Sequence, residues 1–122
     1  MTRVRSVLFD FDGLLANTEP LHFETFLQVL AENDVLLPPG TERSDFTGIH
    51  DRASFRKAFS KVGRSIEPDL VEELVDRKSK LYLEEAAKIE LFEGTRELLD
   101  SIPAGLPYTI ASGGRRRDIL TV

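Results

Sequence analysis

Asp10 and Asp12 stand one residue apart, directly after a short apolar run and directly before Gly13. Side chains alternate along a strand, so both acids would project from one face if the strand continues, while Phe9 and Phe11 point into the core. A carboxylate can attack phosphorus to form an aspartyl-phosphate, and a neighbouring acid can protonate the leaving oxygen and later activate water. We therefore predict Asp10 as a nucleophile and Asp12 as a general acid/base.

The same two acids predict a metal site. Carboxylates a few ångströms apart raise each other's pKa unless a cation or a proton lies between them, and a bound Mg²⁺ removes that conflict. Gly13 lets the chain bend sharply and lets backbone N–H groups approach a ligand closely. We expect Mg²⁺ at Asp10 and Asp12 and phosphate beside Gly13. The residues leave one alternative open, a strand followed by an Asx-type turn in which Asp12 and Gly13 serve only the turn.

A second signal lies about a hundred residues later, where the apolar run 108–111 ends at Ser112 and Gly113 follows. A hydroxyl beside glycines with free backbone N–H groups suits an oxyanion. The carboxyl ends of strands in an open α/β sheet face the usual ligand crevice, so Ser112 could meet Asp10 across a phosphate. Taken alone, the same residues are also typical of a loop or a helix cap.

Four helices are predicted between these two strands, because apolar residues recur there at spacings of three and four. Their expected positions are Pro20 to about Asn33, about Asp51 to Val62, about Pro68 to Ala87, and a short helix around 98–102. The order of strand, helical block, helix and strand predicts an α/β fold, a doubly wound core interrupted after its first strand. We place a partial core at 1–16 and 90–122 and an inserted helical cap at 17–89.

Composition indicates a globular chain of 122 residues, with 41% hydrophobic residues, 30% charged residues and a formal net charge of −5. The chain contains no cysteine, which excludes disulfides and thiolate metal sites. A mildly acidic balance gives no support for nucleic-acid binding. No stretch approaches the roughly 20 apolar residues of a membrane span, and the amino terminus does not have the pattern of a signal peptide. We therefore expect a cytoplasmic protein without nucleic-acid or membrane partners.

Residues 7–19 resemble the first motif of the haloacid dehalogenase-like superfamily, D-x-D-G-x-L-x-D-[ST]. The resemblance implies a Rossmann-like core with a cap that closes over the site. It also implies a phosphatase or phosphomutase, because the dehalogenases of the family usually have no acid at the position of Asp12. Asn17 departs from the motif, where an Asp is common, and so removes a charge near the implied metal. Ser112 and Gly113 match the second motif of the family.

Two weaker matches resemble the β-phosphoglucomutase-like branch, which includes phosphoglycolate and sugar-phosphate phosphatases. They are His22, at its spacing from the first motif, and the stretch 48–52, which ends in Asp51-Arg52. The resemblance implies that His22 is a hinge or assists acid/base chemistry and that Arg52 contacts a substrate phosphate or hydroxyl. A satisfied helical histidine, and an N-cap followed by a solvated arginine, are the alternatives.

Arg77 and Lys78 lie on the third predicted helix and could face the substrate, since the cap of this family often supplies a cation from this region. A salt bridge on a solvated helix face is the interpretation we favour. The resemblance covers nearly all of the chain but only about the amino-terminal half of a family member, because the family's later lysine and acidic metal motif have no counterpart here. We expect low activity for the isolated chain.

Three hypotheses follow from these patterns. The first is a Mg²⁺-dependent phosphatase acting through an aspartyl-phosphate on a small phosphorylated metabolite, with a phosphosugar mutase as its variant. The second is a non-catalytic interaction module, because a two-stranded sheet has an exposed edge that favours self-association or a partner chain. The third is a fragment of a fold with no function of its own.

Overall fold

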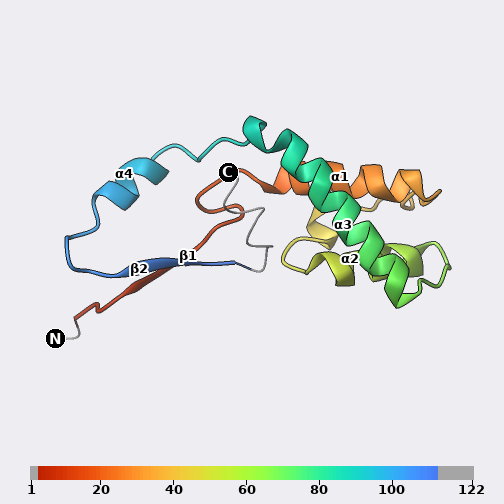
Figure 1. The fold of residues 1–122 in the computed structure, drawn as a ribbon, viewed down its shortest axis with the longest axis horizontal. Coiled ribbons are helices and arrows are strands. Elements are labelled where there is room, and N and C mark those ends of the chain that lie inside the picture. The colour runs from red at the N-terminus through yellow and green to blue at the C-terminus, as the bar shows by residue number, and fades with distance from the viewer. Residues whose placement is uncertain (1–2, 113–122) are drawn as a thin grey trace.

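The computed structural model describes residues 3–112 of the chain (Figure 1), so Gly113, which the sequence predicts to bind phosphate, lies outside the described residues. Within these described residues, two short strands and four α-helices follow one another in the predicted order. Two 3₁₀ turns accompany the helices. The elements are β1 (Val7–Asp10), α1 (Glu19–Glu32), η1 (Arg43–Asp45), α2 (Asp51–Lys61), α3 (Pro68–Glu85), η2 (Ala86–Lys88), α4 (Thr95–Asp100) and β2 (Tyr108–Ala111).

The two strands pair in parallel, with Val7 opposite Tyr108 and Asp10 opposite Ala111. Because their carboxyl ends meet at one edge, residues that follow β1 and β2 leave the sheet on the same side. Phe9 and Phe11 are 8% and 6% exposed, as predicted, and belong to a small apolar cluster that also receives side chains from around α4. Together with the family assignment given below, this arrangement confirms the predicted α/β class.

Helices α1, α2 and α3 pack against one another and, with η1, form what we call the helical group, which stands beside the strands and α4 (Figure 1). Its apolar side chains make a second and larger cluster, in which Val29, Leu30 and Phe55 are completely buried. Each cluster buries its own apolar side chains away from water. This burial is the main favourable contribution to the free energy that stabilises each part. Residues 3–112 therefore have one small core at the sheet and one larger core among the helices.

The two parts are connected by chain segments that run side by side. Ala16 forms an antiparallel bridge with Leu91. The Asn17 N–H donates to the Glu90 carbonyl at 2.9 Å, and the Phe92 N–H donates to the Leu15 carbonyl at 3.1 Å. These bonds tie the exit from the first strand to the return from the helices, so the two connections constrain each other.

Two details differ from the expectations. The first strand ends at Asp10, and a turn at 13–15 follows it, so Asp12 does not continue the strand. The third helix ends at Glu85 and continues as the 3₁₀ turn η2 instead of remaining α-helical to Ala87. No helix in residues 3–112 has the length and apolar character needed to cross a membrane.

The helical group offers a direct test of where stability resides. Leu30 is completely buried and Leu36 is 79% exposed. Leu30→Ala should lower the free energy of unfolding by about 2–5 kcal/mol, because it removes transfer energy and leaves a cavity. Leu36→Ala, the same substitution on the surface, should change it by less than about 0.5 kcal/mol. Urea unfolding of the two variants measures both, and equal effects would contradict the packing described.

Candidate active site

Asp10 is the last residue of β1, and the turn that follows it sets the directions of the neighbouring side chains. The Phe11 N–H donates to Asp10 Oδ1 at 2.9 Å. Gly13 has a φ of +77°, and its N–H donates to the Ala16 carbonyl at 3.0 Å. A Cβ at this position would lie 2.7 Å from Glu19 Oε1. The turn therefore requires a residue that tolerates a positive φ and leaves room for a side chain from α1.

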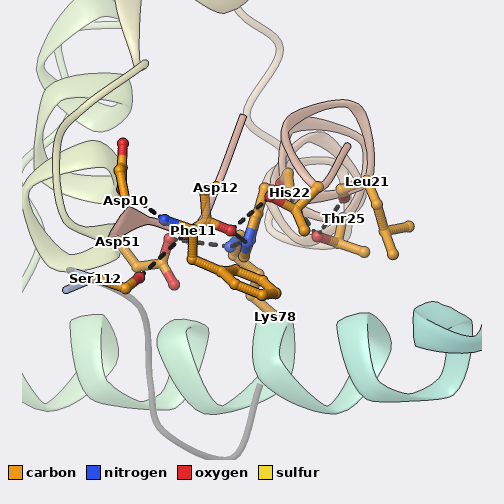
Figure 2. A network of polar contacts seen from close by, with 10 residues as sticks. Asp10, Phe11, Asp12, Leu21, His22, Thr25, Asp51, Lys78 and Ser112 are labelled. Carbon is orange, nitrogen blue, oxygen red and sulfur yellow. Dashed lines mark hydrogen bonds and ion pairs between the residues drawn. The ribbon is translucent and has the colours of Figure 1, made fainter. Parts of the chain in front are cut away.

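Asp12 lies in this turn and connects both strand ends to the first helix (Figure 2). Its Oδ1 accepts a hydrogen bond from Thr18 Oγ1 at 2.5 Å and lies 3.3 Å from His22 Nε2. Its Oδ2 accepts from Ser112 Oγ at 3.3 Å. The serine that follows β2 thus meets the acid that follows β1, with α1 completing the contact. The structure brings together three residues that the sequence singled out for chemistry.

These contacts set the charge state of Asp12. Burial raises the pKa of its carboxyl, but hydrogen bonds from His22, Thr18 and Ser112, with an electrostatic contribution from His22, outweigh burial and bring the pKa below its usual value. Donors to a carboxylate favour its ionised form. Asp12 is therefore a carboxylate at neutral pH in this arrangement.

Lys78 is only 3% exposed, and it extends the contacts of Asp12 into α2 and α3. Its Nζ lies 3.0 Å from Asp51 Oδ1 and 2.9 Å from His22 Nδ1 (Figure 2). An ammonium group has only donors, so His22 Nδ1 accepts and Nε2 is the nitrogen that carries a proton toward Asp12. The ring of Tyr82 stacks on His22 at a centroid distance of 4.3 Å. The imidazole is thus held on its face and at both nitrogens.

The sequence favoured a solvated salt bridge for both Arg77 and Lys78. The structure shows such a salt bridge for Arg77 but not for Lys78. The Arg77 guanidinium pairs with Glu32 at 3.0 Å on an accessible surface. The sequence does contain a signal that Lys78 is buried, because this residue falls within the three-and-four spacing of the buried face of α3. Residues of that face on either side of it are buried, namely Val71, Leu74, Val75, Leu81 and Tyr82.

A cleft of about 560 Å³ lies between the end of β1 and the helical group. Asp10 and Asp12 line it, and so do His22, which the resemblance implies as a hinge or acid/base-assisting residue, and Arg52, which it implies as a substrate contact. The Arg52 guanidinium, however, is already paired through Nη2 with Glu72 Oε2 at 3.0 Å. The cleft therefore gathers most of the predicted site residues, and their roles remain predictions.

The carboxylate oxygens of Asp10 and Asp12 are the kind of ligand that Mg²⁺ prefers, but they are too few to hold it. One oxygen of Asp10 accepts from the Phe11 N–H, and both oxygens of Asp12 accept from Thr18, His22 or Ser112. Among residues 3–112 there is no group of three or more His, Cys, Asp or Glu side chains placed to hold a metal ion. A hard cation takes six or more oxygen ligands, of which water can supply several. The described residues therefore do not make a Mg²⁺ site by themselves.

Comparison with known proteins gives the class of this chain. The family model described as haloacid dehalogenase-like hydrolase matches residues 7–121. The match spans both strands, the helical group and the acids at the end of β1. The chain belongs to the family of haloacid dehalogenase-like hydrolases, and its fold is a partial α/β core of that type.

Several solved structures share the fold. CbbY from Rhodobacter sphaeroides in complex with phosphate is 21% identical, with a TM-score of 0.80, and the match covers 98% of this chain and 55% of that one. A variant of CbbY in complex with xylulose-(1,5)-bisphosphate is 20% identical, with a TM-score of 0.80 and the same coverages of 98% and 55%. A proposed phosphoglycolate phosphatase from Lactobacillus plantarum is 20% identical, with a TM-score of 0.79, again at 98% and 55% coverage.

The chain thus spans about half the length of the solved structures it matches. No curated protein sequence matches it significantly. At about one-fifth sequence identity, the structural likeness establishes the fold and leaves activity and substrate to be proposed.

The bonding of Asp12 predicts a specific pH dependence. Its pKa in the folded chain is below the unfolded value of about 4, so the stabilisation it contributes is complete above that value. The stabilisation is then lost as the pH falls through the folded-state pKa. Urea unfolding between pH 6 and about pH 2.5 should show a steeper loss of stability for the natural chain than for Asp12→Asn. Parallel curves for the two proteins would contradict the bonding described.

The contact between Lys78 and His22 predicts a single imidazole tautomer. Ring ¹⁵N chemical shifts at pH 8 should show a protonated Nε2 and an unprotonated Nδ1 for His22, because the Lys78 ammonium donates to Nδ1. His50, the other histidine, is exposed and serves as an internal control with mixed tautomers. Lys78→Met should shift the Nδ1 resonance of His22, because its donor is lost, whereas Nε2 should stay protonated, because the Asp12 carboxylate still accepts from it. An Nδ1 chemical shift unchanged by that substitution would exclude the hydrogen bond from Lys78.

Proposed function

We propose that this chain carries the nucleophile and the substrate-facing helices of a phosphatase that acts on a small phosphorylated metabolite. The observation that carries the proposal is the position of Asp10 and Asp12 at the carboxyl end of β1, where both line one cleft with residues of the helical group. Ser112 supports it, because this hydroxyl follows β2 and donates to Asp12 from the same edge of the sheet.

In the proposed reaction, a carboxylate oxygen of Asp10 attacks the phosphorus atom of a phosphomonoester. A bond forms between this oxygen and phosphorus, and the bond from phosphorus to the ester oxygen breaks, which leaves an aspartyl-phosphate and an alcohol. Water then attacks the phosphorus and releases inorganic phosphate, restoring Asp10. The accessible position of Asp10 at the cleft suits such an attack.

Asp12 would move the protons. As an ionised carboxylate, it is ready to take a proton from the attacking water in the second half of the reaction. In the first half it must donate a proton to the leaving oxygen, and the approach of a phosphate dianion favours its protonated form, because like charges raise the pKa of a carboxyl. Thr18 and His22 keep the carboxyl directed while this exchange occurs.

The remaining predicted residues take supporting roles in the proposal. Ser112, Gly13 and Gly113 would contact the phosphate, and His22 would orient Asp12. The helical group, within residues 17–89, would act as a cap that excludes water from the cleft. Mg²⁺ is the cofactor we propose, with Asp10 and Asp12 among its ligands and the rest of the coordination sphere supplied from outside the described residues.

Release of inorganic phosphate from a panel of phosphomonoesters, with and without Mg²⁺, tests the proposal. Asp10→Asn should abolish release, because it removes the attacking charge with little change in volume. Asp12→Asn should slow release on the order of a hundredfold or more, because only the proton transfer is lost. The exposed Asp100, in α4, provides the matched control Asp100→Asn, which should leave the rate unchanged.

Phosphate release that survives Asp10→Asn would contradict the nucleophile assignment. A natural chain that is folded but inactive on the whole panel, with and without Mg²⁺, would contradict phosphatase activity of this chain. Transfer of the phosphoryl group to a sugar hydroxyl without release of phosphate would identify a mutase, which shares the first half of the reaction.

A further inference from the structure

Three lysine or arginine residues line the cleft, and two of them are neutralised by an acid of the helical group. The Nζ of Lys78 lies 3.0 Å from Asp51 Oδ1, and Nη2 of Arg52 lies 3.0 Å from Glu72 Oε2. The third is Arg43, whose side chain has no ion pair or hydrogen bond with any described residue. Within residues 3–112, Arg43 is thus the cationic side chain of the cleft that remains available to a ligand.

The segment that carries Arg43 is held firmly, although the arginine itself is exposed. The η1 turn is closed by a reciprocal capping box, in which the Glu42 N–H donates to Asp45 Oδ2 at 2.9 Å and the Glu42 side chain accepts in return. Phe46, directly after the turn, is 8% exposed. Lys57 on α2 donates to the Asp45 carbonyl and lies over the Phe46 ring at 5.2 Å. The backbone at Arg43 is therefore fixed beside the cleft.

The lining of the cleft is divided by charge. Asp10 and Asp12 enter it from the end of β1 and Glu19 from the start of α1, so this side is acidic. Arg43 enters from η1, a different segment of the helical group. A guanidinium presents a planar set of donors that binds a carboxylate or a phosphate through two parallel hydrogen bonds. An anionic group at this position would therefore be recognised by both charge and shape.

We infer that Arg43 recognises a second anionic group on the substrate. The substrate class is then a small phosphomonoester that carries a carboxylate or a second phosphate away from the reacting phosphorus. The inference rests on the proposed function, because it assumes that the first phosphate lies beside Asp10. It also assigns substrate recognition to Arg43 in place of Arg52, whose guanidinium Glu72 already occupies.

Direct calorimetric binding to the full 122-residue chain tests this inference with three probes. Ethyl phosphate has one anionic group, 2-phosphoglycolate adds a carboxylate, and propane-1,3-diyl bisphosphate adds a second phosphate. The natural chain should bind one or both two-anion probes about tenfold more tightly than ethyl phosphate, as expected for a hydrogen-bonded charge pair. The probe with the larger gain shows which anion the site prefers.

Arg43→Gln should remove this preference and leave the affinity for ethyl phosphate unchanged. Arg56→Gln is the matched control, because Arg56 is exposed on α2 and is not among the residues that line the cleft. Arg43→Lys should keep part of the preference, since it keeps the charge and loses the paired geometry. Thermal melting of each variant confirms that the fold is retained.

The inference would be overturned if the preference persists in Arg43→Gln, or if the natural chain shows no preference. In either case, binding of ethyl phosphate would leave the proposed phosphate site intact. Failure of all three probes to bind the natural chain would overturn both, because the phosphate site beside Asp10 would then be absent. Equal losses in Arg43→Gln and Arg56→Gln would show general charge attraction and would also overturn the role of Arg43.

Discussion

The structure of the site depends above all on the carboxylate of Asp12, whose side chain is 28% exposed. An ionised group removed this far from water needs donors, and the donors it finds come from separate parts of the chain: Thr18 before α1, His22 within α1 and Ser112 after β2. Satisfying one charge therefore brings both strand ends and the helical group together. The cleft, whose lining includes Asp12 and His22, lies where these parts of the chain meet.

Two further features constrain how the strand ends and the helical group come together. The paired connections around Ala16 and Leu91 constrain the entry to and return from the helical group. Within that group, Lys78 forms an ion pair with Asp51 and donates to His22, so a buried charge on α3 orients the imidazole that faces Asp12. A buried lysine is costly unless it is paired and hydrogen-bonded, and here both conditions are met. The position of the His22 imidazole beside Asp12 thus depends on residues from three helices that share one apolar core.

Much of this could be predicted from the sequence, since it depends on local pattern. The spacing of apolar residues located the four helices, the alternation around Phe9 and Phe11 identified the core side of the first strand, and the motif at 10–13 identified the acids. The direction of Asp12 could not be predicted, because it depends on where the strand stops and on donors up to a hundred residues away. The burial of Lys78 and the pairing of Arg52 with Glu72 likewise depend on the packing of α2 against α3. Periodicity could have indicated the burial of Lys78, whereas nothing local indicates the partner of Arg52.

The proposed role of Asp10 as nucleophile is tested most directly by finding which residue becomes phosphorylated. The full chain would be incubated with acetyl phosphate as a small phosphoryl donor, quenched in acid and digested, and the phosphorylated residue located by mass spectrometry. Asp12→Asn would be treated in parallel, because slower proton transfer should allow the phosphorylated form to accumulate. We expect a phosphoryl group on Asp10 that is lost at alkaline pH, as an acyl phosphate should be. Phosphorylation of any other residue, or no phosphorylation of a folded chain, would contradict this role of Asp10.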